Sequence, residues 1–189
     1  MLGFMGLLSF VHRWQQSYGY GVQSPSVYYY IKYVLNEQFP YYAYDELLQL
    51  SVSPHDQSIK LSRLYLRLAN FHQPHVWLDL CPENDTVKEY IHAGCRHTSY
   101  YSVTQMDSLP HVDVARLMND DRVLYEKLLP KMTPHSVLLI NNIRNDRHIL
   151  SFWNDIEDDK RIGLTIDLYS IGIAFFDGRP KLNYTIYLR

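Results

Sequence analysis

Glycine is scarce in this chain of 189 residues. There are eight glycines, about 4% of the sequence against a typical ~7%, and none occurs between Gln23 and Ala93. A Walker loop or a GxGxxG turn needs closely spaced glycines, because only glycine lets the backbone bend that sharply against a phosphate. The sequence contains neither motif, which excludes the common glycine-rich phosphate loops.

Cysteine and long apolar runs are also rare. Cys81 and Cys95 are the two cysteines, too few for a disulfide framework, and with His92 and His97 they match no common zinc module. The sequence therefore predicts no metal site and the reduced thiols of a cytoplasmic protein. It contains no run of about 18 or more apolar residues, so no transmembrane segment is expected.

The charge is nearly balanced, with 18 basic and 20 acidic side chains and a formal net charge of −2. A protein that coats DNA or RNA usually carries a basic surplus, so no nucleic-acid partner is expected. The chain is 47% hydrophobic and 20% charged, which excludes an intrinsically disordered protein. Its length suits one domain with a substantial core.

The first residues form an apolar segment. Residues 1–11 are mostly apolar, but they lack the basic start of a signal peptide, and no small-residue cleavage site follows them. The pattern predicts an amphipathic helix over residues 5–17 that docks on the body of the protein. A peripheral membrane anchor is the alternative.

Tyrosine is abundant and concentrated in one segment of the chain. Nine of the 17 tyrosines fall between Tyr18 and Tyr44. Tyrosine combines a large apolar ring with a polar tip, which suits interfaces and the edges of ligand sites. Three interpretations stay open: packing of an N-terminal head on the core, a homodimer or protein-partner surface, and a lid over a substrate.

Periodicity and turn residues predict an α/β domain. Helices are expected over 24–36, 44–49, 58–71, 84–93, 120–129 and 146–158, and strands over 76–80, 99–105, 112–117, 136–140, 164–169, 171–176 and 182–188. Alternating strands and helices imply a mostly parallel sheet with helices on both faces. Asp177-Gly178 turns the chain into its last strand, so a terminal antiparallel hairpin is expected. Residues 1–72 form a helical head packed on a core of residues 73–189, together one structural domain.

Three segments resemble the signatures of a known family. Residues 18–28 (YGYGVQSPSVY) resemble HG-hydrophobic-HSPF-V-aromatic, residues 41–47 (YYAYDEL) resemble YYAY-E-I, and residues 165–176 (TIDLYSIGIAFF) are similar to TIDLF-x-x-GIVFF. These signatures are typical of bacterial, Bacteroidetes-type, class I S-adenosylmethionine-dependent methyltransferase-like proteins. The resemblance implies a Rossmann-like, seven-stranded sheet with a reversed final hairpin. It also implies a cofactor beyond the carboxyl ends of the first strands.

The expected cofactor turn departs from the family pattern E/D-x-G-x-x-x-G. Residues 79–85 read DLCPEND: the acidic residue is present, both glycines are absent, and Pro82 stiffens the turn. No acidic residue for the ribose ends the next strand, at 101–105. By position in the fold, the candidate cofactor residues are as follows: Asp79, Cys81, Glu83, Thr104 and Asn141. The simpler interpretation of the turn is a helix cap at Asn84 or Asp85. No catalytic residue is predicted.

The spacing of the strands gives a second departure. Three βα units should separate the first and fourth strands of an intact sheet, which needs roughly 50–60 residues. Residues 81–111, between Leu80 and Val112, number only 31. The sequence therefore predicts that one βα unit is missing and that the edge strand is lost.

Acidic and amide side chains follow the later strands. Asp120 and Asp121 follow the strand at 112–117, and Asn141-Asn142 follow the strand at 136–140. Relatives hold substrate or a divalent metal at such positions, but a hard cation prefers carboxylates to an amide pair. Capping of the helix at 120–129 is the simpler role for Asp120.

Two functional hypotheses follow. The residues favour a degenerate homologue that has lost S-adenosylmethionine and acts through its surface, as a homodimer or with a protein partner bound by its tyrosine-rich head. The alternative is an active S-adenosylmethionine-dependent methyltransferase with an atypical cofactor loop and an unknown substrate. A filled crest at 81–85 favours the first hypothesis. An open cleft lined by Asp79, Thr104 and Asn141 favours the second.

Overall fold

The computed structural model describes residues 21–37, 39–50, 56–82, 84–118 and 120–188. The helix predicted over 5–17 and the candidate Glu83 lie outside this part of the chain. Within the described residues, no helix has the length and apolar composition needed to cross a bilayer.

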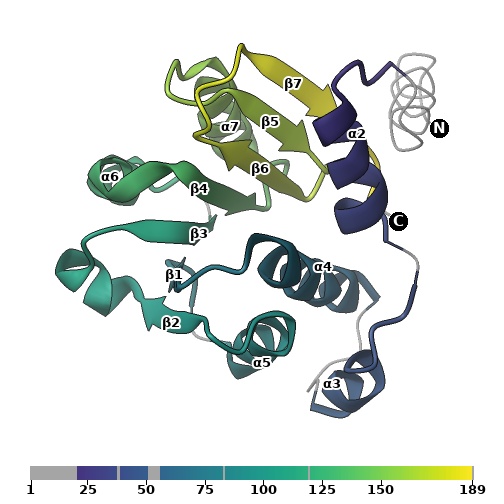
Figure 1. Cartoon of the computed structure of the whole chain (residues 1–189). Coiled ribbons are helices and arrows are strands. Elements are labelled where there is room, and N and C mark those ends of the chain that lie inside the picture. Colours follow the sequence, from purple (N-terminus) through teal and green to yellow (C-terminus); the bar gives the residue numbers. More distant parts are fainter. Residues whose placement is uncertain (1–20, 38, 51–55, 83, 119, 189) are drawn as a thin grey trace.

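A single seven-stranded sheet runs through the molecule (Figure 1). Its strands are β1 (Val76–Asp79), β2 (Ser99–Ser102), β3 (Val112–Met118), β4 (Met132–Asn141), β5 (Leu164–Asp167), β6 (Ile171–Phe175) and β7 (Leu182–Thr185). They lie in the order β2-β1-β3-β4-β6-β5-β7. β6 runs antiparallel to both of its neighbours, and all other pairs are parallel. The predicted α/β class, mostly parallel with one reversed strand near the end, is confirmed.

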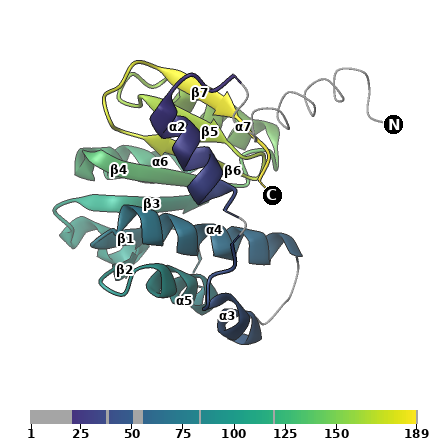
Figure 2. The ribbon, with the colours of Figure 1, turned by 45° about the vertical axis from the view of Figure 1, so that its right-hand side comes forward.

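Helices cover both faces of the sheet (Figures 1 and 2). The α-helices are α2 (Pro25–Tyr30), α3 (Tyr44–Leu50), α4 (Asp56–His72), α5 (Asp85–Gly94), α6 (Arg122–Leu128) and α7 (Arg147–Asp158). A π-helical turn (Ile31–Leu35) continues α2, and two short 3₁₀ helices span Val103–Ser108 and Leu129–Lys131. α2, α4 and α5 pack on one face, and α6 and α7 pack on the other. α3 packs on the outer side of α4 and α5.

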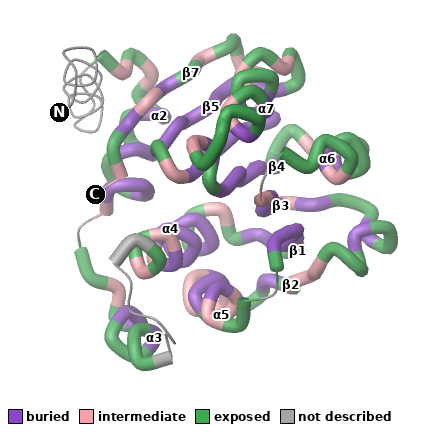
Figure 3. Tube along the Cα trace, turned by 180° about the vertical axis from the view of Figure 1, so that it is seen from behind, coloured by how far each residue is buried: buried purple, intermediate pink, exposed green. Residues whose placement is uncertain are grey.

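Alternation of side chains along the strands divides the core in two. Trp77, Val114 and Leu139 face the α4 side, whereas Leu78 and Ala115 face the α6 side. Because helices cover both faces, the central strands are mostly apolar and buried. β1 is buried from Trp77 to Asp79 and β4 from Ser136 to Asn141, and Figure 3 shows buried residues in purple.

The predicted loss of one βα unit is confirmed. The chain between β1 and β3 forms α5, one strand and a short 3₁₀ helix. β2 is therefore the edge of the sheet on that side of β1. The sheet still has seven strands because β7 extends its opposite edge.

The position of β7 corrects the predicted terminal hairpin. The prediction paired the last two strands around Asp177-Gly178, but β7 pairs in parallel with β5. β6 already lies between β4 and β5, so neither of its edges is open to β7. The antiparallel hairpin is instead formed by β5 and β6, and the chain from Phe176 crosses over to the free edge of β5.

The strand predicted over 99–105 is too long. It ends at Ser102, where Gln105 makes a capping box: its side-chain oxygen accepts from the Ser102 N–H at 3.0 Å. This local hydrogen bond competes with the ladder and starts the 3₁₀ helix. Thr104 consequently lies on that helix and not at a strand end.

The head shares the core of the sheet. Tyr30 is buried, its ring packs edge-on against Phe71 and Phe175, and its hydroxyl lies 2.9 Å from Nε2 of His72. Tyr44 is buried as well, which supports the packing interpretation for these two tyrosines. The boundary drawn at residue 72 stays a prediction.

His72 makes stability sensitive to acid. Burial lowers the pKa of its imidazole from the ordinary 6.5 to about 4. As the pH falls below 6.5, the imidazole of His72 becomes protonated in the unfolded chain but stays neutral in the folded chain. The free energy of unfolding therefore decreases until about pH 4, where the folded chain is protonated too. The side chain keeps some contact with water, and we expect a loss of about 1–2 kcal/mol from this group between pH 7 and pH 5.

Urea unfolding at the two pH values measures this effect. His72→Gln keeps a polar partner for Tyr30 but does not titrate. It should therefore abolish the part of the decrease in unfolding free energy between pH 7 and pH 5 that His72 causes. His135 is exposed, and His135→Gln is the matched control that should leave the loss unchanged. An identical loss in the wild type and in His72→Gln would contradict the prediction.

Candidate functional site

The carboxyl ends of β1, β3 and β4 meet where the strand order changes direction. From β1 the sheet continues to β2 on one side and to β3 and β4 on the other. In doubly wound sheets, ligands bind in the crevice at this switch point. Asp79 and Asn141 are the last residues of β1 and β4, and Cys81 follows β1, so three of the predicted cofactor residues lie at this edge.

Asp79 forms a buried ion pair with Arg116 of β3. The two residues are partners in the parallel register, and both are nearly inaccessible, at 1% and 4% exposed. Nε of Arg116 lies 3.0 and 3.1 Å from the two carboxylate oxygens of Asp79, and Nη2 lies 2.6 Å from Oδ2. This forked geometry is the strongest form of carboxylate recognition.

Two further donors complete the environment of the Asp79 carboxylate. The backbone N–H of Cys81 donates to Oδ1 at 2.9 Å, and the Tyr100 hydroxyl donates to Oδ2. A carboxylate offers about four acceptor sites. The two N–H groups of Arg116, the Cys81 amide and Tyr100 occupy them.

The network continues across the edge of the sheet. The Arg116 guanidinium lies 5.2 Å from the ring centroid of Tyr65 on α4, and the Tyr65 hydroxyl donates to Oδ1 of Asn141 at 3.0 Å. Burial raises the pKa of the Tyr65 hydroxyl. The pKa of the Tyr100 hydroxyl is also raised, mainly by burial and secondly by its hydrogen bond to Asp79. We call these five residues the crest network: Asp79, Tyr100, Arg116, Tyr65 and Asn141.

Cys81 is enclosed beside the crest network. Its Sγ lies 3.8 Å from the backbone oxygen of Arg116, and burial raises the pKa of the thiol to about 12. The thiolate is the nucleophilic form of cysteine, so burial and the raised pKa both disfavour a nucleophilic role for Cys81.

The structure brings together some of the predicted site residues. Asp79 and Cys81 contact Arg116, Asn141 is linked to it through Tyr65, and none of the three is more than 6% exposed. Thr104 is exposed on the 3₁₀ helix, where its hydroxyl lies 3.0 Å from that of Ser102. Their predicted role in holding a cofactor stays a prediction.

Arg116 is the site residue that sequence reasoning missed. Its signal was visible, since it is a charged residue in the middle of a mostly apolar strand, VDVARLM. A buried arginine needs an anionic partner, but several acidic residues were available. Only the register of β3 against β1 selects Asp79.

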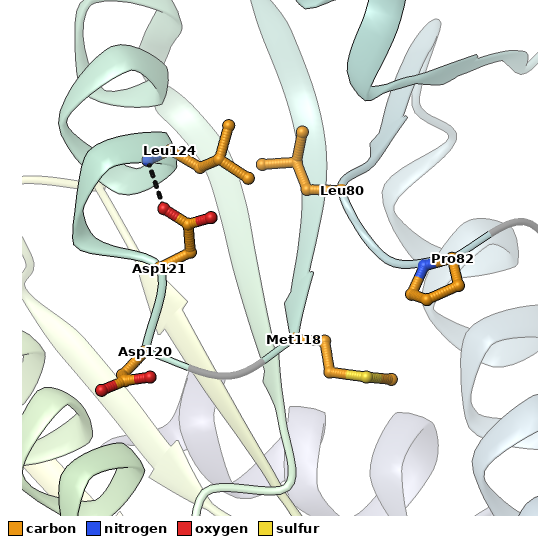
Figure 4. A pocket seen from close by; sticks show the side chains of 6 residues that line it. All are labelled: Leu80, Pro82, Met118, Asp120, Asp121 and Leu124. Carbon is orange, nitrogen blue, oxygen red and sulfur yellow. Dashed lines mark hydrogen bonds between the residues drawn. The ribbon is translucent and has the colours of Figure 1, made fainter.

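A pocket opens on the other side of the same edge (Figure 4). Its volume is about 460 Å³, and its lining residues are Leu80, Pro82, Met118, Asp120, Asp121 and Leu124. Oδ1 of Asp121 accepts from the backbone N–H of Leu124 at 2.9 Å, so Asp121 caps α6 in place of the predicted Asp120. Asp120 contributes an exposed carboxylate to a lining that otherwise consists of Asp121 and four apolar residues.

A second ion pair lies at the end of β5. The buried Asp167 binds Arg144 and accepts from the backbone N–H of Tyr169 at 2.7 Å. The Arg144 guanidinium lies 5.4 Å from the ring centroid of Tyr169. Both acidic strand ends, at β1 and at β5, are thus neutralised by an arginine from a neighbouring segment.

Metal ligands do not gather at either place. In the part of the chain that the structure describes, no group of three or more His, Cys, Asp or Glu side chains could hold a metal ion. Asp120 and Asp121 are the two carboxylates of the pocket.

These features define the Rossmann-like fold of methyltransferases, and solved structures share it. The O-methyltransferase TomG from Streptomyces achromogenes, involved in tomaymycin synthesis and solved with SAM, is 11% identical; the match covers 79% of this chain and 95% of that chain, with a TM-score of 0.51. The SAH-bound methyltransferase PaMTH1 from Podospora anserina is 11% identical. This match covers 72% of this chain and 88% of that chain, with a TM-score of 0.51. No family model and no curated protein matches the sequence. At these identities the likeness establishes the fold.

Proposed function

We propose that this protein is a degenerate homologue of class I S-adenosylmethionine-dependent methyltransferases that has lost cofactor binding and acts through its surface. The ion pair between Asp79 and Arg116 carries the proposal. Asp79 stands where the family resemblance places the acidic residue of the cofactor turn, and its acceptor sites are occupied. A ligand that bound Asp79 would have to displace Arg116 and leave its buried charge unpaired, at a cost of about 3–5 kcal/mol.

The turn after β1 supports the same conclusion. A backbone that passes close to a ligand needs glycine, and residues 80–85 contain none. Leu80 and Cys81 are buried, and the backbone N–H of Leu80 donates to the Arg116 carbonyl at 2.8 Å. The first two residues of the turn are thus held against β3, whereas Pro82, Asn84 and Asp85 are exposed.

The alternative is an active methyltransferase with an atypical cofactor loop. The pocket of about 460 Å³ beside Leu80 and Asp120 favours it, because that volume lies in the range of small-molecule sites. The similar structures of TomG and PaMTH1 hold SAM and SAH. This alternative would place the cofactor on the α6 side of the crest network.

The family resemblance also supports a bacterial origin, and the two free, buried cysteines suit a cytoplasmic protein. We further propose that the tyrosine-rich head carries the partner surface.

Calorimetric titration with S-adenosylmethionine and S-adenosylhomocysteine tests the proposal. We expect no binding at millimolar ligand, whereas TomG, titrated in parallel, should bind. Micromolar binding of either ligand would overturn the proposal and support the active enzyme.

A matched variant locates the ligand in that case. Asp120→Asn alters the exposed carboxylate of the pocket and leaves the crest network intact. A changed affinity in this variant would place the ligand in the pocket.

A further inference from the structure

The helix formed by α2 and its π-helical continuation has one buried side and one exposed side. The buried side belongs to the core of the sheet. The exposed side carries three large rings: Tyr28 at 36%, Tyr29 at 53% and Tyr33 at 44% exposed. A helix on a protein surface normally turns charged side chains to water, but Lys32 is the only charged residue of this helix. We call these four residues the tyrosine ridge.

The side chains of the tyrosine ridge contact one another. The rings of Tyr29 and Tyr33 lie 4.8 Å apart between centroids. Nζ of Lys32 lies 5.0 Å from the ring centroid of Tyr33 and 5.7 Å from that of Tyr28. Because these contacts already order the rings, a partner that binds them loses less conformational entropy.

The exposed aromatic surface continues beyond the helix. Phe39 and Tyr42 are 80% and 79% exposed, and they belong to the connection that Figures 1 and 2 show running from α2 to α3 along the outside of the molecule. The buried Arg67 holds both ends of this connection. It donates to the backbone oxygen of Leu35 at 2.9 Å and to the Tyr44 hydroxyl at 3.3 Å. Phe39 and Tyr42 therefore extend the surface of the ridge.

Two charges of opposite sign lie on this surface. Lys32 is in the ridge, and Glu37 follows the helix, where its Oε1 accepts from the backbone N–H of Phe39 at 2.9 Å. Among the side chains that the structure describes, neither Lys32 nor Glu37 forms an ion pair with another. A surface that carries one cation and one anion, each without an ionic partner in its own chain, is complementary to a copy of itself.

The exposed rings are large enough for a stable contact between two copies. An aromatic side chain offers roughly 200 Å² of surface, so the exposed parts of the five rings on this surface amount to about 600 Å² per copy. Two copies would bury about 1,200 Å² through these rings alone, and a specific interface needs ~1,000 Å² or more.

We propose that the tyrosine ridge, together with Glu37, Phe39 and Tyr42, binds the same surface of a second copy of this chain. The inference rests on the proposed role of the head as the partner surface, and it names that partner. A closed homodimer has a twofold axis, so each contact occurs twice. Lys32 of each copy pairs with Glu37 of the other copy, and the aromatic rings of the two copies pack around these ion pairs.

Exchange of the two charges tests this pairing. In a homodimer, Lys32→Glu places two acidic side chains opposite each other, and Glu37→Lys places two basic ones opposite each other. Either variant alone should therefore dimerise about tenfold more weakly than the wild type, or less. A mixture of the two variants should form a heterodimer with an affinity close to that of the wild type, because residue 32 of each copy then faces the opposite charge at residue 37.

Sedimentation velocity of the full-length protein measures the dimer, at concentrations from micromolar to near millimolar. We expect the wild type to dimerise, and Tyr29→Ser/Tyr33→Ser should raise the dissociation constant about tenfold or more. Val123 provides the matched control, since it is 67% exposed on α6 at the opposite face of the sheet. Val123→Ser should leave the dissociation constant unchanged. Circular dichroism of each variant confirms that it is folded.

Three outcomes would overturn the inference. The wild type could stay monomeric over the whole concentration range, and the partner of the head would then be a different protein. The wild type could form a dimer that Tyr29→Ser/Tyr33→Ser leaves unchanged, or the two charge variants could fail to associate when mixed.

The proposed loss of S-adenosylmethionine is decided separately, by the calorimetric titration. The tyrosine ridge shares no residue with the crest network or with the pocket. Dimerisation can therefore fail while the proposed loss of the cofactor stands, and the reverse also holds.

Discussion

Replacing Arg116 by methionine should lower the free energy of unfolding by about 3–5 kcal/mol. The variant fills the same space but leaves the Asp79 carboxylate buried without its cation. The Cys81 amide and the Tyr100 hydroxyl still donate to it, yet neither supplies a charge. Urea unfolding at neutral pH measures the loss.

A double variant separates the charge from the packing. Asp79→Asn/Arg116→Met removes both charges and should recover most of the stability lost in Arg116→Met, because a neutral pair has no desolvated ion to compensate. Arg122 provides the matched control, since its ion pair with Asp155 is exposed, at 54% and 57%. Arg122→Met should cost at most about 1 kcal/mol. If Arg116→Met and Arg122→Met lost the same free energy of unfolding, the prediction would be contradicted, because burial of the Asp79–Arg116 pair would then make no difference to stability.

The second large effect is expected at Gly94, the last residue of α5. A Cβ at this position would lie 2.2 Å from the backbone oxygen of Leu66 and 3.0 Å from Cβ of Ala69. The first contact is with backbone, so α4 and α5 must move apart. We expect Gly94→Ala to lose about 2–3 kcal/mol in spite of the better helix propensity of alanine.

The thermal unfolding midpoint and urea unfolding both report this loss. Glu89 is exposed on the same helix, and Glu89→Ala should change stability by no more than about 0.5 kcal/mol. A stabilised Gly94→Ala protein would show that the two helices can separate freely and would contradict the account.

Gly94 also shows what a local pattern leaves out. A glycine directly after the helix predicted over 84–93 is typical of a left-handed helix end, and α5 does end there. Its φ is not positive, however, and Cys95 caps the helix in an extended conformation. The glycine is needed because another helix crosses at that point, and no local pattern contains this information.

The elements that sequence reasoning placed well depend on local chemistry. The apolar run at 136–140, the Ser24-Pro25 helix start and the Asn84 cap are interactions between near neighbours, so their residues are sufficient evidence. The missing βα unit is equally readable, because chain length limits how many elements can fit between β1 and β3.

The features that sequence reasoning did not place depend on contacts between residues that are far apart in the chain. The partner of β7, the ion pair of Asp79 with Arg116 and the contact at Gly94 join residues that are distant in the chain, and each has several alternatives of similar chemistry in the sequence. Register and helix crossing select one of them. The residue pattern of this protein therefore specifies a trimmed methyltransferase sheet. Whether its acidic strand end is open to a ligand or closed by an arginine depends on a strand register that only the packed sheet sets.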